Sequence, residues 1–279
     1  MGIEHKLGRM VEPAGEPKKV AVIGGGPAGM RTAIYAAQRG HDVTVYEKTD
    51  QLGGQIIHGD YASFKWPIGE YKAWLIRQGG FDTVVACTGA APKIPGSMKG
   101  FADENGSLKA GYWFCTDVFG REQELGKNVV IVGASETGVE TAMYLCENGH
   151  NVTLLTRQKS IGHDCSRLHY ITMAFVGPDP VTGREGMRPA WEAYPNLKGI
   201  TEVTTKQVDG NTVTYVDAQG QEQTITADSV VLCGGMKPLT DEALSFSDAA
   251  DGFFLVGDCN GAGNLQRVNR QAFSRAMQI

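Results

Sequence analysis

The chain has 279 residues, of which 42% are hydrophobic and 20% are charged, and its formal net charge is −5. This composition excludes the collagen-like and disordered classes, and the acidic balance gives no reason to expect a nucleic acid as a partner. The length suggests about two domains. Glycine, with 37 residues, stands well above its usual share of about 7%, which indicates many turns and close backbone approaches.

The cysteines and the apolar segments indicate where the protein is located and whether it binds a metal. The six cysteines form neither a C-x-x-C pair nor a run of iron–sulfur ligands. No stretch of about 18 apolar residues and no signal peptide is present, so we expect a cytoplasmic protein with reduced thiols. His163, Cys165 and His169 lack a fourth ligand and a recognised zinc spacing, and we therefore expect no metal site.

A dinucleotide-binding pattern begins near residue 18. The apolar run at 18–23 is typical of a buried parallel strand, and it leads directly into GGGPAG at 24–29. Gly24, Gly26 and Gly29 match the G-x-G-x-x-G fingerprint, whose glycines permit a tight turn, the approach of a pyrophosphate and close helix packing. A helix is expected over 30–38 and a second strand over 42–46.

The groups around this turn predict how a dinucleotide binds. The helix N-terminus, with Pro27 and Ala28 in its first turn, offers free N–H groups and a positive dipole to phosphates. Glu47, with Lys48 beside it, ends the second strand about 20 residues after the glycines, where a carboxylate accepts ribose hydroxyls. The alternative is a glycine-rich turn without a ligand, but strand, glycines, helix, strand and acid in register favour a site.

The same pattern occurs a second time. Residues 127–157 align without a gap on 18–48, at a constant offset of 109 positions. Gly133 and Gly138 stand where the first unit has Gly24 and Gly29. Ser135, followed by Glu136 and Thr137, replaces Gly26, and its hydroxyl can donate to a phosphate although close backbone approach is harder. A second dinucleotide site is therefore expected.

The strand end of the second unit predicts which nicotinamide cofactor is used. Thr156 and Arg157 stand where the first unit has Glu47 and Lys48, so no carboxylate occupies the ribose position. Arg157 could meet a 2′-phosphate, which favours NADPH over NADH. The alternative is that Arg157 is a solvated residue at a strand end.

The remaining segments predict the elements that complete two such domains. Alternation of apolar and polar residues over 203–225, with turns at 209–211 and 219–220, indicates a small antiparallel meander. The other expected elements are a glycine turn at 51–55, a partly helical segment at 61–78, strands at 81–90, 229–235 and 252–258, a polar helix at 116–126 and a last helix at 264–278.

Five segments, in order, carry a resemblance to a known family: GGGPAG at 24–29, LGGQ at 52–55, CTGAAPKIPG at 87–96, GASETG at 133–138 and VGDCNGAGN at 256–264. The set resembles the flavoprotein reductases that have two dinucleotide-binding domains. It is most similar to the C-terminal FAD/NAD(P)-binding half of the 2,4-dienoyl-CoA reductase branch of the old yellow enzyme family, which includes bile-acid and enoate reductases.

The resemblance implies FAD on the first unit and NADP or NAD on the second. It places Glu47 at the FAD ribose and Asp258, after Gly257, at the ribitol or pyrophosphate, with the helix that begins at Asn264 directed at the flavin ring. The other cofactor-binding residues that it implies are Gly54, Gln55, Thr88 and Gly89 for FAD, and Gly234 and Gly235 at a strand end of the NAD(P) domain.

The expected fold class is α/β, with two Rossmann-like three-layer domains and a small antiparallel meander. The resemblance implies that the NAD(P) domain is inserted in the FAD domain: residues 1–17 form a leader, 18–105 and 236–279 the FAD domain, and 106–235 the NAD(P) domain. Gly79-Gly80 stands where relatives have a strand pair that touches the adenine, which bears on FAD affinity.

The expected function is that of an FAD-dependent NAD(P)H oxidoreductase. Family members carry an N-terminal barrel with FMN and a four-cysteine iron–sulfur cluster, so this chain is expected to be a reductase module that passes electrons to such a partner or to a small acceptor. The cofactors carry the chemistry, and no side chain is assigned as acid, base or nucleophile. The alternative is a nucleotide-binding structural module without turnover.

The choice between NADPH and NADH can be tested by replacing Arg157 with Ala. We expect NADPH to reduce the flavin of the wild-type chain faster than NADH does. In the variant, the ratio of the NADPH rate to the NADH rate should fall about tenfold, because the 2′-phosphate loses a cationic donor. The measurement is the ratio of flavin reduction rates with the two cofactors. A wild-type preference for NADH, or an unchanged ratio in the variant, would contradict the prediction.

Overall fold

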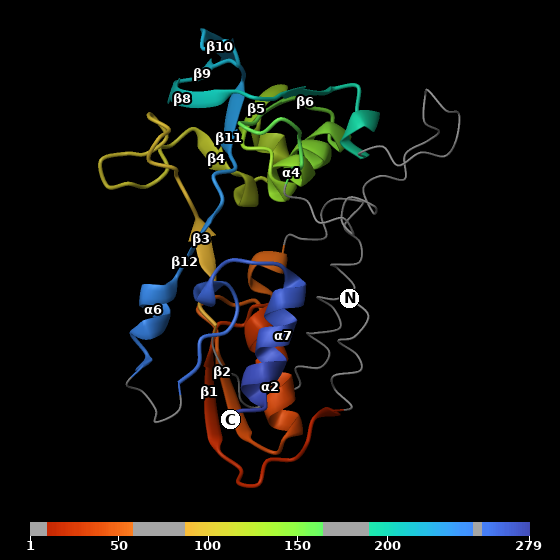
Figure 1. The fold of residues 1–279 in the computed structure, drawn as a ribbon, viewed down its shortest axis with the longest axis vertical. Helices are drawn as coiled ribbons and strands as arrows, with labels where there is room; N and C mark the ends of the chain where they lie inside the picture. The colour runs from red at the N-terminus through yellow and green to blue at the C-terminus, as the bar shows by residue number, and fades with distance from the viewer. Residues whose placement is uncertain (1–9, 58–86, 164–189, 248–252) are drawn as a thin grey trace. The chain divides into compact units, whose positions relative to one another are not determined.

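The computed structural model describes residues 10–57, 87–163, 190–247 and 253–279 (Figure 1). These residues form two compact units. The first unit contains 10–57, 87–91, 236–247 and 253–279, and the second contains 92–163 and 190–235. The division thus falls after Ala91 and after Gly235, whereas the sequence places the first of these boundaries after residue 105. Which cofactor each unit holds is still a prediction.

The first unit is built on a strand–helix–strand repeat. Strand β1 (Lys19–Ile23) pairs in parallel with β2 (Asp42–Tyr46), and helix α2 (Pro27–Gln38) connects them. The helix begins three residues earlier than expected because Pro27 suits the first helical position, where no N–H is needed. Val22, Ala33, Ala36 and Val43 bury the apolar faces of these elements against one another.

Helix α7 (Leu265–Ala276) packs against α2 in the same unit, as Figure 1 shows. Tyr35 and Phe273 meet edge to face, with their ring centroids 5.4 Å apart. Val256, Val268 and Ala272 close a small apolar cluster around Ala28 at the start of α2. The short helix α6 (Thr240–Leu244) also belongs to this unit.

The second unit contains a five-stranded parallel sheet in the order β4-β11-β5-β6-β7. Its strands are β4 (Tyr112–Phe114), β5 (Asn128–Val132), β6 (Asn151–Leu155), β7 (Leu197–Ile200) and β11 (Ser229–Leu232). Helix α4 (Glu136–Glu147) connects β5 to β6. Each bound of β5, α4 and β6 lies 109 positions after the matching bound of β1, α2 and β2, so the repeat is realised element by element.

Three layers follow from the alternation of side chains along β5. Val129 and Ile131 face the core that contains α4, whereas Val130 and Val132 face the core beneath the meander. The meander is antiparallel and consists of β8 (Thr204–Asp209), β9 (Thr212–Val216) and β10 (Glu222–Thr226). The expected α/β fold with parallel sheets and a small meander is confirmed.

Two short strands mark the passages of the chain between the units. Strand β3 (Ala90–Pro92) pairs with β12 (Met236–Pro238). Only the last residue of the strand expected at 81–90 lies in a described strand, β3, and its residues 81–86 fall outside the described residues. The expected segment at 61–78, the Gly79-Gly80 join, Cys165 and His169 also fall outside them.

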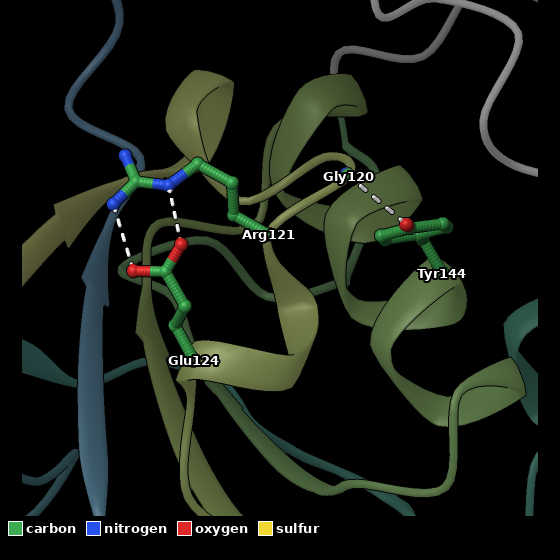
Figure 2. A network of polar contacts seen from close by, with 4 residues as sticks. All are labelled: Gly120, Arg121, Glu124 and Tyr144. Carbon is green, nitrogen blue, oxygen red and sulfur yellow. Dashed lines mark hydrogen bonds and ion pairs between the residues drawn. The ribbon is translucent and has the colours of Figure 1, made fainter.

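Two expected elements are wrong in the described residues. The polar helix at 116–126 is replaced by short 3₁₀ turns at Cys115–Asp117 and Glu122–Glu124. Gly120 has a positive φ, which an α-helix does not accept, and its N–H donates to the Tyr144 hydroxyl 3.2 Å away (Figure 2). Residues 253–256 of the strand expected at 252–258 form no described strand.

An ion pair spans the second of these 3₁₀ turns. The Arg121 guanidinium donates two hydrogen bonds to the Glu124 carboxylate, at 2.8 and 2.9 Å (Figure 2). Both side chains are exposed, so this pair shapes the turn rather than supplying much stability. Within the described ranges, none of the helices is long and apolar enough to cross a membrane.

The packing of α4 gives a stability prediction. Leu145 is fully buried in the core that contains α4, and its replacement by Ala should lower the free energy of unfolding by about 2–5 kcal/mol through lost contacts and a cavity. Urea unfolding can be followed by tryptophan fluorescence because Trp113 and Trp191 pack against the same core. Gln221→Ala, at an exposed turn, is the control, and equal midpoints for the two variants would contradict the packing described.

Candidate nucleotide-binding sites

The turn after β1 is fixed by a close approach between two backbone segments. Gly24 has φ +110°, and a Cβ at this position would lie 2.1 Å from the carbonyl oxygen of Cys87. Any other residue would be strained in its backbone and would clash with that carbonyl. The position therefore requires glycine for the fold itself, whether or not a ligand binds.

Gly26 differs from Gly24 because the protein's own packing does not require it. It caps α2 with an extended backbone, φ −73° and ψ −179°, which every residue type can adopt. The nearest atom to a Cβ built here is Gly54 Cα, at 3.9 Å. The missing side chain leaves the backbone open at this point, which fits the approach of a group such as a pyrophosphate.

The N-terminus of α2 is suited to an anion. Among the described residues no side chain caps this helix, and its first turn carries no acidic residue. Ala28 and Gly29 are buried in this turn, just after Pro27. The positive end of the helix dipole is therefore not neutralised by a carboxylate of the first turn or by a cap.

Glu47 lies beside this turn and is tied to it. Its Oε2 accepts a hydrogen bond of 2.5 Å from the Gly25 N–H, and its Oε1 accepts hydrogen bonds from the N–H and the hydroxyl of Thr49 at 3.0 and 2.9 Å. Burial alone would raise the pKa of this carboxyl, but the hydrogen bonds lower it below its usual value. The group is therefore ionised at neutral pH, and Oε2 keeps a lone pair for a ribose hydroxyl. Lys48 is exposed.

A second glycine loop covers the first. The Gly53 N–H donates to the Gly25 carbonyl at 2.9 Å, and a Cβ at Gly25 would lie 2.3 Å from the Leu52 side chain. Gly25 is not among the residues predicted from the sequence, and the second unit makes the same contact, since the Gly162 N–H donates to the Ala134 carbonyl at 3.0 Å. Gly54 lies against Gly26, and the Gln55 side chain donates to the Ala90 carbonyl at 3.1 Å. The role of Gly54 and Gln55 toward FAD stays a prediction.

The segment Gly257–Asp258 reaches the same turn. A Cβ at Gly257 would lie 2.7 Å from Ala28 Cβ, so the chain passes directly over the start of α2. Burial raises the pKa of the Asp258 carboxyl above its usual value. Gly24, Gly26, Ala28, Glu47, Gly54 and Gly257 thus converge around one helix N-terminus.

Two other predicted residues lie on a different segment of the unit. The Thr88 hydroxyl donates to the Leu239 carbonyl at 3.2 Å, and the Gly89 carbonyl accepts from the Leu239 N–H at 3.0 Å. These contacts hold the residues after Cys87 against the start of α6. The role of Thr88 and Gly89 toward a cofactor stays a prediction.

The second unit repeats the turn with different chemistry. A Cβ at Gly133 would lie 2.2 Å from the Cys233 carbonyl oxygen, and one at Gly138 would lie 2.1 Å from the Gly133 carbonyl oxygen. Ser135 takes the cap position of α4, and its hydroxyl lies 3.7 Å from the Cys233 sulfur rather than capping the helix. Glu136 places a carboxylate in the first turn, next to the exposed Thr137.

The strand end of the second unit offers no carboxylate. Thr156 is buried, and its hydroxyl accepts a hydrogen bond from the Gln158 N–H at 3.2 Å. Arg157 is exposed at the end of β6. Packing alone requires glycine at position 234, because a Cβ there would lie 2.2 Å from the Lys93 carbonyl oxygen. The role of Gly234 and Gly235 toward a cofactor is still a prediction.

Comparison with known families gives two matches. Residues 22–85 match the NAD(P)-binding Rossmann-like domain, and residues 77–169 match the pyridine nucleotide-disulphide oxidoreductase family. The first match contains the glycine turn and Glu47, and the second contains the turn at Gly133.

Curated relatives are similar over almost the whole chain. A NADH oxidase of Thermoanaerobacter brockii is 29% identical over 96% of this chain and 42% of its own length. A cinnamate reductase of Clostridium sporogenes is 28% identical over 100% of this chain and 41% of its own length. The chain therefore spans less than half the length of these relatives.

Solved structures agree on the fold. 2-Naphthoyl-CoA reductase in complex with 2-naphthoyl-CoA superposes with a TM-score of 0.79 and 27% identity, over 96% of this chain and 41% of that one. The thioredoxin reductase of Lactococcus lactis has a TM-score of 0.64 at 15% identity, over 94% and 97% of the two chains, and supports the fold alone. The duplicated unit and these matches together support the broad superfamily of FAD/NAD(P)-dependent oxidoreductases, with FAD and NAD(P) as the cofactors.

Proposed function

We propose that the chain is an FAD-dependent NAD(P)H oxidoreductase module, with FAD on the first unit and NAD(P)H on the second. The observation that supports this most directly is the repeat: β1–α2–β2 and β5–α4–β6 have matching bounds, and each has a glycine turn at the start of its helix. A protein that transfers hydride between two dinucleotides needs two such sites, which a single-cofactor binding module does not.

The first unit fits FAD better than the second for three reasons. Gly26 leaves the backbone open where Ser135 does not, and α2 has no acidic first turn where α4 has Glu136. Glu47 supplies an ionised carboxylate held in place by Gly25 and Thr49. A tightly held flavin is expected on the site with the stronger anion and ribose contacts.

When bound, FAD supplies the hydride acceptor and NAD(P)H the donor, and the chain's residues bind and orient them. The N–H groups at the start of α2 would neutralise the pyrophosphate charge, and Glu47 would fix the ribose. On the second unit, the Ser135 hydroxyl would donate to a phosphate and Arg157 would pair with a 2′-phosphate. No side chain of the described residues is assigned as a proton donor or acceptor.

The electron acceptor is part of the proposal and rests on the resemblance described above. We propose that the chain is the reductase half of a 2,4-dienoyl-CoA reductase-like or old yellow enzyme-like system. Relatives named cinnamate reductase and bilirubin reductase are 28% and 26% identical and more than twice as long as the aligned part of this chain. Their additional length leaves room for a further domain, which the resemblance implies to be a barrel with an iron–sulfur cluster and FMN. A small acceptor such as a dye would replace this partner in vitro.

The test uses the 279-residue chain with added FAD and NADPH under anaerobic conditions. We expect FAD to bind, its absorbance to bleach on addition of NADPH, and an artificial dye to be reduced. Cinnamate should not be reduced, because the proton donor and substrate pocket belong to the proposed barrel. Binding of FAD without bleaching would favour a structural nucleotide-binding module, and reduction of cinnamate would contradict the reductase-half assignment.

The two glycines of the first turn separate cofactor binding from folding. Gly26→Ala should leave thermal stability nearly unchanged, since its backbone is extended and unobstructed, but should weaken FAD binding at least about tenfold by blocking the pyrophosphate. Gly24→Ala should destabilise the fold, because its Cβ meets the Cys87 carbonyl. FAD titration and thermal unfolding of both variants provide the measurement. Unchanged FAD affinity in Gly26→Ala would argue against a pyrophosphate at this turn.

A further inference from the structure

The loop that connects Gly257 to helix α7 is held in a closed shape by its own contacts. The Asp258 Oδ1 accepts a hydrogen bond from the Gly263 N–H at 3.0 Å, which joins the two ends of the loop. The Asn264 side chain accepts from the Arg267 N–H at 3.0 Å and caps α7. The loop residues 258–264 are therefore fixed at both ends.

The Arg267 side chain, although exposed, contacts the backbone of this loop. Its guanidinium donates to the carbonyl oxygens of Asn260 and Ala262, at 3.0 and 3.1 Å. Two carbonyls on one planar cation hold the intervening Gly261 in a defined position, because the guanidinium donors have a fixed geometry. Arg267 thus contributes a backbone contact to the cap and two side-chain contacts to the loop.

The glycines of the loop fit around this side chain. A Cβ at Gly261 would lie 3.0 Å from the Arg267 Nη2, and one at Gly263 would lie 2.8 Å from its Cδ. The two glycines thus lie directly against the arginine, whose side chain remains exposed on its other side. Burial raises the pKa of the Asp258 carboxyl, and both the Gly263 N–H and the Arg267 charge act in the opposite direction.

The next exposed arginine of α7 makes no such contacts. Arg270 lies three residues further along the helix, and across the described ranges no hydrogen bond or ring contact is found for its side chain. The two arginines share their residue type, helix and exposure. A difference between their variants therefore reports on the loop contacts rather than on the charge of the helix.

We propose that Arg267 is the positioning residue of the FAD site, and that its guanidinium fixes the loop 258–264 so that Asp258 and the N-terminus of α7 are presented to the cofactor. This rests on the proposed function, in which Asp258 contacts FAD. The arginine acts through the loop and is not itself a catalytic residue.

The experiment compares Arg267→Gln, Arg267→Lys and the control Arg270→Gln in the full chain. Hydrogen exchange of the FAD-free protein should accelerate in the peptide that covers 258–264 only in Arg267→Gln. FAD affinity, measured by quenching of flavin fluorescence, should fall about tenfold in Arg267→Gln because two charge-assisted hydrogen bonds are lost. Arg267→Lys should recover most of this affinity, since an ammonium can donate to both carbonyls.

The outcomes separate this proposal from the function on which it rests. Equal FAD affinity in Arg267→Gln and Arg270→Gln would overturn the positioning role. An equal loss of affinity in the lysine and glutamine variants would also overturn it, because the lysine retains donors for the loop. Absence of FAD binding by the wild-type chain would overturn the proposed function and the cofactor role of Arg267 together, and faster exchange in Arg267→Gln would then show a loop contact alone.

Discussion

The structure depends on one steric constraint that occurs twice. In each unit the backbone turns from a strand into a helix directly against a neighbouring carbonyl, that of Cys87 for Gly24 and that of Cys233 for Gly133. A side chain of any size would push the turn away from that carbonyl. The close approach sets where the helix begins, and the helix N-terminus then lies at the carboxyl end of the strand, where a phosphate can reach it.

The two units use this shared frame differently. In the first, a carboxylate at the end of β2 binds the glycine turn itself through the Gly25 N–H. In the second, Ala134 replaces that glycine and Thr156 turns its hydroxyl to its own chain at Gln158. One unit is thus organised around a fixed negative charge, whereas the other leaves its strand end without one. The two units therefore share the path of the backbone and differ in the charge at the end of the second strand.

The sequence predicts the local elements of this frame well, because they depend on short-range signals. The apolar runs, the spaced glycines and the gapless alignment locate β1, α2, β2 and their counterparts to within a few residues. The helix expected at 116–126 failed because polar periodicity does not show that Gly120 must adopt a positive φ. Cys87 and Leu52 contact the glycine turn from segments far away in the chain, and Arg267 contacts backbone carbonyls of its own loop. Neither kind of contact produces a pattern of side chains that can be recognised in the sequence.

The two ends of the second unit meet at one point. The Lys93 N–H donates to the Gly235 carbonyl at 2.9 Å, and β3 pairs with β12 just outside that contact. A segment whose ends are neighbours can be added to or removed from a host fold by bridging a short gap, because closing such a gap has a small entropic cost. The 92–235 segment therefore has the geometry of an exchangeable cassette, and a short turn from Ala91 to Met236 would leave the strands and helices of the first unit contiguous.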